Sequence, residues 1–226
     1  MSIKLIISGS TGKMGMSLIS SLNRFNNFKL VYSASSSNYA IPEAGIIIDF
    51  SEPSFSLKIL GQAVQKKIPM LIGTTGFSKE EFDLIKESSR KIPILFAPNT
   101  SLGIFSLKKM IFEALPFINS DTEITISETH HKDKKDSPSG TALEISNLLK
   151  KDLSLTNSIN IKSFREDDSS GQHTIKLKNK FEEITLTHQS FDRRVYSDGA
   201  YLAAKWLLSR DPGLYQISDI YLSKST

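Results

Sequence analysis

The 226-residue sequence contains no cysteine. This absence excludes disulfide scaffolds, zinc ribbons, thiol nucleophiles and cysteine-ligated iron–sulfur clusters. No apolar run approaches the ~18 residues that a transmembrane helix needs, and the apolar stretch at the N-terminus is too short for a secretory signal peptide. We therefore expect a cytoplasmic protein that does not associate with a membrane.

Neither sign of charge dominates: the chain has 28 Lys and Arg residues and 24 Asp and Glu residues, which gives a net charge of +4. A small basic excess suits either nucleic acid or small anionic ligands. The basic stretch that begins at Lys132 has no interleaved aromatic residues, which argues against a nucleic-acid groove. We expect a small anionic ligand and no nucleic-acid partner.

Short apolar runs in the first hundred residues predict strands that are buried on both faces. These runs are Lys4–Ser8, Leu30–Ala34, Gly45–Phe50, Met70–Thr74 and Ile94–Ala97. Helical spacing of apolar residues follows Gly15, Pro53 suits a helix start, and Ser78 with Glu81 forms a capping-box pattern. The alternation predicts an α/β fold in which a Rossmann-like parallel sheet has helices on both faces.

After about residue 102 the pattern changes. Thr122–Thr129 alternates like a half-buried strand, helix signals run from Ser139 to Lys151, and His173–Lys178 with Glu183–His188 predicts an antiparallel hairpin. We predict an α+β domain over residues 102–199 with an open mixed sheet suited to a subunit interface. Residues 1–101 and 200–226, which include a helix pattern at Ala200–Ser209, would form the first domain.

The first strand leads into a glycine-rich turn and then a helix. The turn has the pattern GxxGxxG, with glycines at Gly9, Gly12 and Gly15. Glycine allows the close approach of a pyrophosphate, and the helix N-terminus offers N–H groups and a positive dipole. Residues 9–14 therefore predict a dinucleotide-binding loop in which Lys13 adds charge, and the alternative is a glycine turn with no ligand.

Other strand ends extend this site. The second strand is followed by Ser35 and Ser36, with no acidic residue to bind the ribose hydroxyls of NADH and no arginine to mark a 2′-phosphate. Because serine hydroxyls do not repel a 2′-phosphate, this segment favours NADPH over NADH. A solvated serine loop is the alternative. Residues 73–75 and 97–100 follow later strands and are candidates to contact a nicotinamide, or are ordinary turns.

The most informative segment runs from Glu128 to Ala142 and contains His130, His131, Lys134 and a Pro-Ser-Gly-Thr-Ala helix start. Histidine transfers protons near neutral pH, and a helix that begins at Ser139 or Thr141 binds anions. The segment predicts a site for an anionic substrate that is protonated during the reaction. Adjacent histidines on a strand point to opposite faces and rarely bind one metal ion, so we predict no metal site. The remaining alternative is that the charged residues 132–136 form a solvated loop.

These residues resemble the signature of bacterial dihydrodipicolinate reductases, also called 4-hydroxy-tetrahydrodipicolinate reductases. The match is His-His-x-x-Lys-x-Asp-x-Pro-Ser-Gly-Thr-Ala at residues 130–142. Further motifs follow in the family's order: residues 9–15, 49–51, 73–76 and 97–101, then Arg165, Gly171, His173, His188, Arg193 and residues 198–200. The resemblance spans nearly the whole chain.

The resemblance implies NADPH- or NADH-dependent reduction of 4-hydroxy-tetrahydrodipicolinate, with loss of water, in lysine biosynthesis by way of diaminopimelate. It makes His130 the general acid/base and Lys134 the proton donor beside it. It implies substrate-carboxylate contacts from His131, Ser139, Gly140, Thr141 and Thr75. It implies cofactor contacts from Gly9, Ser10, Thr11, Gly12, Lys13, Met14, Ser35, Ser36, Gly73, Thr74, Thr75, Ala97, Pro98, Asn99 and Thr100. Family members are homotetramers built through the second domain's sheet.

The chain is short for this family, and the missing length falls between the second strand and Asp49, where the adenosine half of the cofactor normally binds. Two other functions fit parts of the sequence. Another NAD(P)-dependent dehydrogenase with an anionic substrate would share the fold. A non-catalytic dinucleotide sensor would keep the glycine loop but would not need His130, His131 and Lys134.

Overall fold

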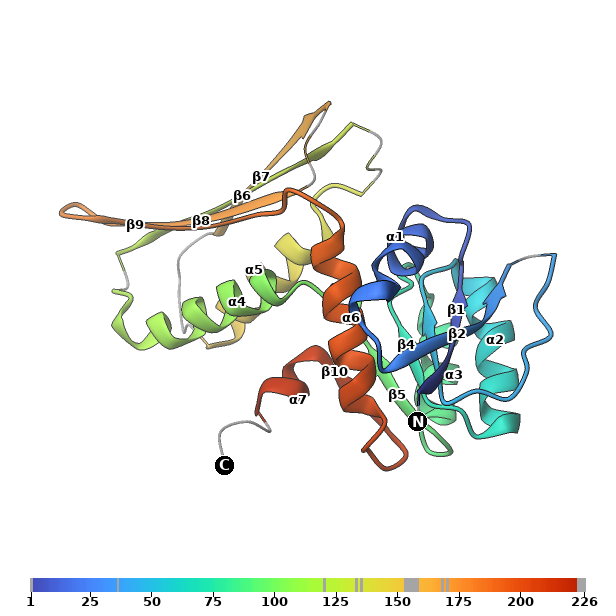
Figure 1. The fold of residues 1–226 in the computed structure, drawn as a ribbon. Coiled ribbons are helices and arrows are strands. Elements are labelled where there is room, and N and C mark those ends of the chain that lie inside the picture. The colour runs from blue at the N-terminus through green and yellow to red at the C-terminus, as the bar shows by residue number, and fades with distance from the viewer. Residues whose placement is uncertain are drawn as a thin grey trace. The chain divides into compact units, whose positions relative to one another are not determined.

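The computed structural model describes residues 2–35, 37–119, 121–132, 134, 136–152, 159–167, 169 and 171–222. The chain forms two compact units, shown in Figure 1: residues up to Ser101 join with residues from Arg194 onward, and Leu102–Arg193 forms the other unit. We predicted a return to the first domain at residue 200. The first unit resumes at Arg194, because that residue already begins the helix α6 (Arg194–Leu207).

A six-stranded parallel sheet forms the centre of the first unit, in the order β10-β5-β4-β3-β1-β2. The strands are β1 (Ile3–Ser8), β2 (Phe28–Ala34), β3 (Ile46–Asp49), β4 (Met70–Ile72), β5 (Pro93–Phe96) and β10 (Gly213–Gln216). The five strands predicted from apolar runs are present within a few residues. The edge strand β10 and the helix α7 (Ile217–Leu222) that follows it were not predicted.

Helices cover both faces of this sheet, as the continuous apolar runs required. Alternate residues of β1 enter different cores: Leu5 and Ile7 pack with α1 (Lys13–Ser21) and α6, whereas Ile6 packs with α2 (Pro53–Lys66) and α3 (Lys79–Ser88). A short 3-10 turn, η1 (Leu22–Arg24), follows α1. The predicted capping box opens α3, since Ser78 accepts from the Glu81 N–H and the Glu81 carboxylate accepts from the Ser78 N–H.

The second unit is a four-stranded mixed sheet in the order β7-β6-β8-β9, with β6 parallel to β7 and the other pairs antiparallel. Its elements are α4 (Leu102–Ala114), η2 (Leu115–Phe117), β6 (Glu123–His131), α5 (Gly140–Asp152), β7 (Ile159–Glu166), β8 (Gln172–Lys178) and β9 (Glu183–Gln189). The predicted hairpin is β8–β9, and the sequence pattern predicted neither α4 nor β7.

One face of this sheet packs on helices and the other does not. Residues of α4 and α5 form one core with inward residues of β6 and β8, such as Ile126 and Ile175. The alternate residues of the same strands are polar and partly or fully exposed, and the hydroxyls of Thr174 and Thr187 lie 3.1 Å apart across β8 and β9 on this open face. The open mixed sheet expected from the sequence is confirmed. Within the described residues, no helix combines the length and apolar character needed to span a membrane.

Candidate active site

The turn between β1 and α1 depends on backbone atoms approaching closely. Gly9 has a φ of +74°, and a Cβ there would lie 2.2 Å from the Phe50 carbonyl oxygen. A Cβ on Gly15 would lie 2.2 Å from the Gly9 carbonyl oxygen. Gly12 is the N-cap of α1 and supplies no side-chain cap. The turn is therefore a concave backbone surface at a helix N-terminus, which fits the pyrophosphate of a dinucleotide.

A buried carboxylate fastens the strand ends around this turn. Asp49, at the end of β3, is fully buried and accepts hydrogen bonds from the hydroxyls of Ser8 (2.5 Å), Ser51 (2.6 Å) and Thr74 (2.7 Å). Burial raises the pKa of Asp49 above its ordinary value, against the opposing effect of the three hydroxyl donors and Ser56. Hydrogen bonds from three hydroxyl groups to the Asp49 side chain thus join the C-terminal ends of β1, β3 and β4.

The predicted nicotinamide contacts follow β4 and β5: Gly73, Thr74, Thr75, Ala97, Pro98, Asn99 and Thr100. Gly73 admits the Phe50 ring, because a Cβ there would lie 2.2 Å from a ring carbon. Thr75 is exposed, whereas Thr74 is buried in the Asp49 network. Thr100 is held by α6: its hydroxyl donates to the Tyr196 carbonyl at 2.6 Å. These segments lie at one edge of the parallel sheet, where ligands bind in such folds.

The residues after β2, Ser35 and Ser36, are the predicted contacts of the adenosine half of the cofactor. Ser35 pairs its backbone with Asn38, and its hydroxyl lies 3.2 Å from that of Ser37, while Ser36 lies outside the described residues. The Ala34 carbonyl accepts from the Gly9 N–H at 3.2 Å and from the Ser10 hydroxyl at 3.3 Å, which ties the glycine turn to this strand. The described residues from Ser35 to Tyr39 carry hydroxyl and amide side chains and no charged group.

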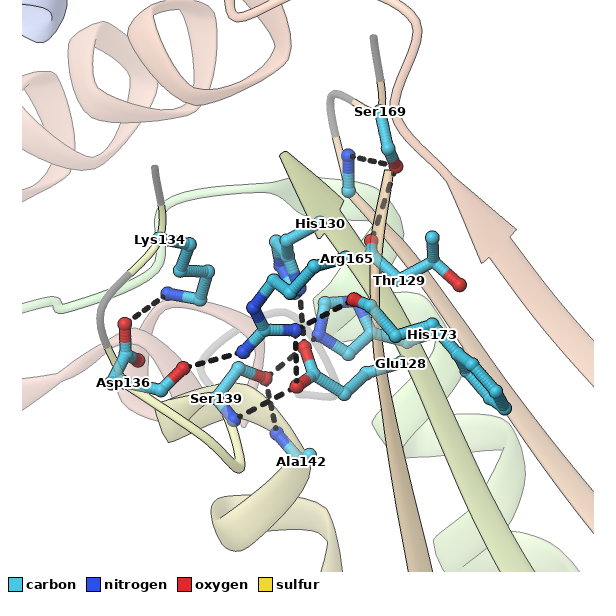
Figure 2. Close-up of polar contacts among 12 residues, drawn as sticks. Glu128, Thr129, His130, Lys134, Asp136, Ser139, Ala142, Arg165, Ser169 and His173 are labelled. Carbon is cyan, nitrogen blue, oxygen red and sulfur yellow. Dashed lines mark hydrogen bonds and ion pairs between the residues drawn. The ribbon is translucent and has the colours of Figure 1, made fainter. Parts of the chain in front are cut away.

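The second unit gathers the predicted proton-transfer residues at the end of β6 (Figure 2). The alternation that turns Ile124 and Ile126 inward also turns Glu128 and His130 inward. Glu128 is fully buried, and one of its oxygens, Oε2, lies against His130 Nδ1. Its other oxygen, Oε1, accepts from Arg165 Nη1 at 3.1 Å and from the Ser139 N–H at 3.3 Å.

A second histidine closes this cluster. His173, on β8, is buried; its Nε2 lies 3.2 Å from the Ser139 hydroxyl, and its ring centroid is 5.0 Å from that of His130. Burial, reinforced by the nearby His130, lowers the pKa of His173 to about 3, so this imidazole is neutral. Ser139 is also the cap of α5, since its hydroxyl accepts from the Ala142 N–H at 3.2 Å.

Lys134 lies in the loop between β6 and α5. Its Nζ is 2.8 Å from the Asp136 carboxylate, and its backbone N–H donates to the His131 carbonyl at 3.1 Å. Arg165 Nη2 donates to the Asp136 carbonyl at 2.5 Å, which links this loop to β7. Of the other predicted substrate contacts, Gly140 is exposed and begins α5, and His131 and Thr141 are half-buried.

Burial and charge set the protonation of the central pair. Burial disfavours the charged form of Glu128, but hydrogen bonds from Ser163 and Arg165 and the charges of His130 and Arg165 outweigh it, so the pKa of Glu128 is lowered. The pKa of His130 is also lowered, mainly by burial, with Glu128 opposing that effect and Lys134 adding to it. The site therefore holds an ionised carboxylate beside a histidine that favours its neutral form.

Glu128, His130 and His173 bring ligand-type atoms within 4.8 Å of one another. A divalent cation there would share the Glu128 carboxylate with the Arg165 guanidinium and would face the positive charge of Lys134. Both charges oppose a cation. The predicted pair His130 and His131 does not enter this cluster together, as expected for neighbours on a strand.

The comparisons with known proteins match both halves of the chain. A family model described as dihydrodipicolinate reductase, N-terminus, matches residues 3–100, and one described as dihydrodipicolinate reductase, C-terminus, matches residues 103–221. The chain belongs to the dihydrodipicolinate reductase family. The resemblance stated from the sequence is thereby confirmed, and the family is one of oxidoreductases.

Individual relatives agree with this assignment. The 4-hydroxy-tetrahydrodipicolinate reductase of Pelagibacter ubique (strain HTCC1062) is 39% identical, with 96% of this chain and 97% of the relative covered. That of Rickettsia bellii (strain OSU 85-389) is 34% identical, with 98% and 95% covered. A solved structure, dipicolinate-bound dihydrodipicolinate reductase from Paenisporosarcina sp. TG-14, shares the fold with a TM-score of 0.77 at 21% identity, covering 96% of this chain and 98% of that one.

Proposed function

We propose that the protein reduces 4-hydroxy-tetrahydrodipicolinate to tetrahydrodipicolinate, with NADPH or NADH as reductant, in the diaminopimelate route to lysine. The net reaction adds one hydride and one proton to the substrate and releases one water. The observation that carries the proposal is the convergence of His130, Lys134 and the N-terminus of α5 at one end of β6, in a chain that belongs to this family.

The first unit supports the binding of a nicotinamide dinucleotide. Gly9, Ser10, Thr11, Gly12, Lys13 and Met14 would hold the pyrophosphate, since the backbone at Gly9 leaves no room for a Cβ and the N-terminus of α1 follows the turn. Residues 73–75 and 97–100 would contact the nicotinamide. When bound, the cofactor supplies the hydride. We propose a preference for NADPH, because Ser35 and its neighbours place no carboxylate against a 2′-phosphate.

The second unit supports the binding of a dicarboxylate. Lys134 supplies positive charge. Ser139 caps α5, and Gly140 and Thr141 are its first residues, where N–H groups and the helix dipole favour anions. His131 and Thr75 are the further proposed carboxylate contacts. Two substrate carboxylates beside His130 would stabilise its protonated form and so counteract the lowered pKa of the unliganded protein.

His130 then acts as the general acid/base toward the substrate, and Lys134 is the proton donor beside it. Proton transfer from a positioned histidine balances the electron pair that hydride addition leaves on the substrate ring. The ring lies largely buried, with 12% of the His130 side chain exposed, which limits competition from water.

The open face of the β7-β6-β8-β9 sheet supports assembly into a homotetramer through the second unit. Thr125, Thr174, Thr185 and Thr187 lie on this face, opposite the face on which α4 and α5 pack. We also propose a cytoplasmic location, in keeping with a biosynthetic role. Size-exclusion chromatography with light scattering tests the tetramer.

The proposed activity is tested by mixing the purified full-length protein with NADPH or NADH and with substrate generated by dihydrodipicolinate synthase. We expect absorbance of the reduced nicotinamide to fall faster with NADPH, and only when substrate is present. A flat trace with both cofactors would refute the reductase. A flat trace together with tight dinucleotide binding would favour a sensor.

A further inference from the structure

Glu128 has no assigned role in the proposed reaction, yet it lies at the centre of the site. It is the fully buried carboxylate on the inward face of β6, two residues before His130. Its contacts come from two other elements of the second unit: Arg165 and the Ser163 side chain on β7, and the Ser139 N–H at the start of α5. A carboxylate held from so many directions has one fixed orientation.

The two oxygens of Glu128 have different partners. Oε1 accepts from Arg165 Nη1 and from the Ser139 N–H, so Oε2 faces His130 Nδ1. An ionised carboxylate can only accept hydrogen bonds. A hydrogen shared between these two atoms therefore comes from His130 Nδ1. Nε2 is left as the nitrogen that exchanges a proton with a bound molecule.

Arg165 extends this arrangement to Lys134. One guanidinium nitrogen, Nη1, donates to Glu128, and the other, Nη2, donates to the Asp136 carbonyl at 2.5 Å. The Asp136 carboxylate in turn pairs with Lys134 Nζ at 2.8 Å. Figure 2 shows this sequence of contacts. The Glu128–Arg165 pair therefore fixes both His130 and the loop that carries Lys134.

We propose that Glu128 is a positioning residue for proton transfer that holds His130 in the Nδ1–H tautomer. Arg165 fixes the Glu128 carboxylate and, through its contact with Asp136, sets the spacing between His130 and Lys134. This inference rests on the proposed reductase function. The charged and titratable groups that face His130 are Glu128 on its own strand, Lys134, Arg165 and His173. Among these groups Glu128 is the anion, so it also stabilises the imidazolium that precedes proton donation.

A purely structural role for the Glu128–Arg165 pair is the competing explanation. Removing one member of a buried ion pair leaves an uncompensated charge and destabilises the fold, whereas removing both members restores much of the stability. The two explanations therefore predict different behaviour for Glu128→Gln alone and for Glu128→Gln combined with Arg165→Met.

The test compares wild type, Glu128→Gln, the double variant and Glu123→Gln, all as full-length proteins. Glu123 is an exposed carboxylate on the same strand and serves as the matched control. Nitrogen-15 NMR of the histidine rings, recorded without substrate, reports the His130 tautomer. Steady-state kinetics with NADPH over a range of pH report kcat, KM and the apparent pKa of the proton-transfer group.

We expect Nδ1–H in wild type and Glu123→Gln, and a shift toward Nε2–H in Glu128→Gln. We expect kcat to fall at least about tenfold, with KM for the substrate little changed and the apparent pKa moved lower. The double variant should recover thermal stability but not kcat. Recovery of kcat in the double variant, or an unchanged tautomer in Glu128→Gln, would overturn the proposal. Inactive wild type with the Nδ1–H tautomer present would refute the reductase function but not the positioning of His130.

Discussion

Asp49 in the first unit and Glu128 in the second are both fully buried carboxylates, and they lie in opposite electrostatic surroundings. Asp49 accepts from three hydroxyls and has no cationic partner among these contacts, and burial raises its pKa. Glu128 faces Arg165 and His130, and their charges help to lower its pKa. The same chemical group thus serves to join strand ends in one unit and to organise charged residues in the other.

This difference separates two tasks. Hydrogen bonds from hydroxyls to Asp49 can fix the strand ends around the glycine turn without a cationic partner. A charged pair can hold a histidine that gains and loses a proton, because the carboxylate favours the imidazolium form. The first unit is accordingly expected to determine dinucleotide affinity, and the second unit is expected to determine the rate of the chemical step.

The largest effect is expected from His130→Ala in the second unit. Loss of the proton-transfer group should lower kcat by about 10²–10⁴-fold. Dinucleotide affinity, measured by the change in NADPH fluorescence, should stay at the wild-type value because the glycine turn is untouched. Wild-type turnover in this variant would remove His130 from the proposed role, and weakened NADPH binding would contradict the division of tasks.

Gly9→Ala should produce the converse result in the first unit. The added Cβ would meet the Phe50 carbonyl at 2.2 Å in a backbone conformation with positive φ. We expect a loss of about 1–3 kcal/mol in the free energy of unfolding and at least about tenfold weaker NADPH binding.

Gly61→Ala is the matched control for this change, because nothing lies within 4 Å of the added Cβ in helix α2. It should leave NADPH binding unchanged and raise stability by up to about 1 kcal/mol. Equal behaviour of the two alanine variants in urea unfolding and NADPH titration would show that the turn does not need glycine at residue 9.

A smaller effect sharpens the comparison of the two carboxylates. A raised folded-state pKa means that the stability contributed by Asp49 is present at low pH and is lost as pH rises through that pKa. A lowered folded-state pKa means that the contribution of Glu128 is present at higher pH and is lost as pH falls. The stability cost of Asp49→Asn should therefore shrink with rising pH, and that of Glu128→Gln should grow.

Urea unfolding of each variant and of wild type, from about pH 3 to pH 7, measures these two trends. Trends of the same sign for both variants would contradict the assignment of opposite surroundings. Glu123→Gln, which alters an exposed carboxylate, should show neither trend.

Much of the first unit was predictable from sequence because its strands are covered on both faces. Residues such as Leu5, Ile6 and Ile7 are all buried, so the apolar run is continuous and marks the strand directly. β7 was missed because its inward positions change from Ile159 and Ile161 to Ser163 and Arg165, and the apolar alternation ends halfway. In α4, exposed Met110 and Phe112 obscured the buried stripe.

The candidate site was predictable only where its residues are close in sequence. His130, Lys134 and Ser139 fall within one short segment, so their types and spacing suggested an anion site. Glu128 follows the inward alternation of Ile124 and Ile126, but it was not predicted as part of the site. Its partner Arg165 lies on β7, 37 residues further along the chain, and only the pairing of β6 with β7 brings the two together.

The discontinuity of the first unit has a consequence for synthesis on the ribosome. β5 acquires its neighbour β10 only after residues 213–216 have been made, and Gly199 closes directly against Thr100, where a Cβ would lie 1.8 Å from the carbonyl oxygen. The nascent chain therefore carries an unpaired β5 edge throughout translation of the second unit. An exposed parallel strand edge is a site of misassociation. Efficient production of this protein is consequently expected to depend on how quickly translation proceeds from residue 97 to residue 216.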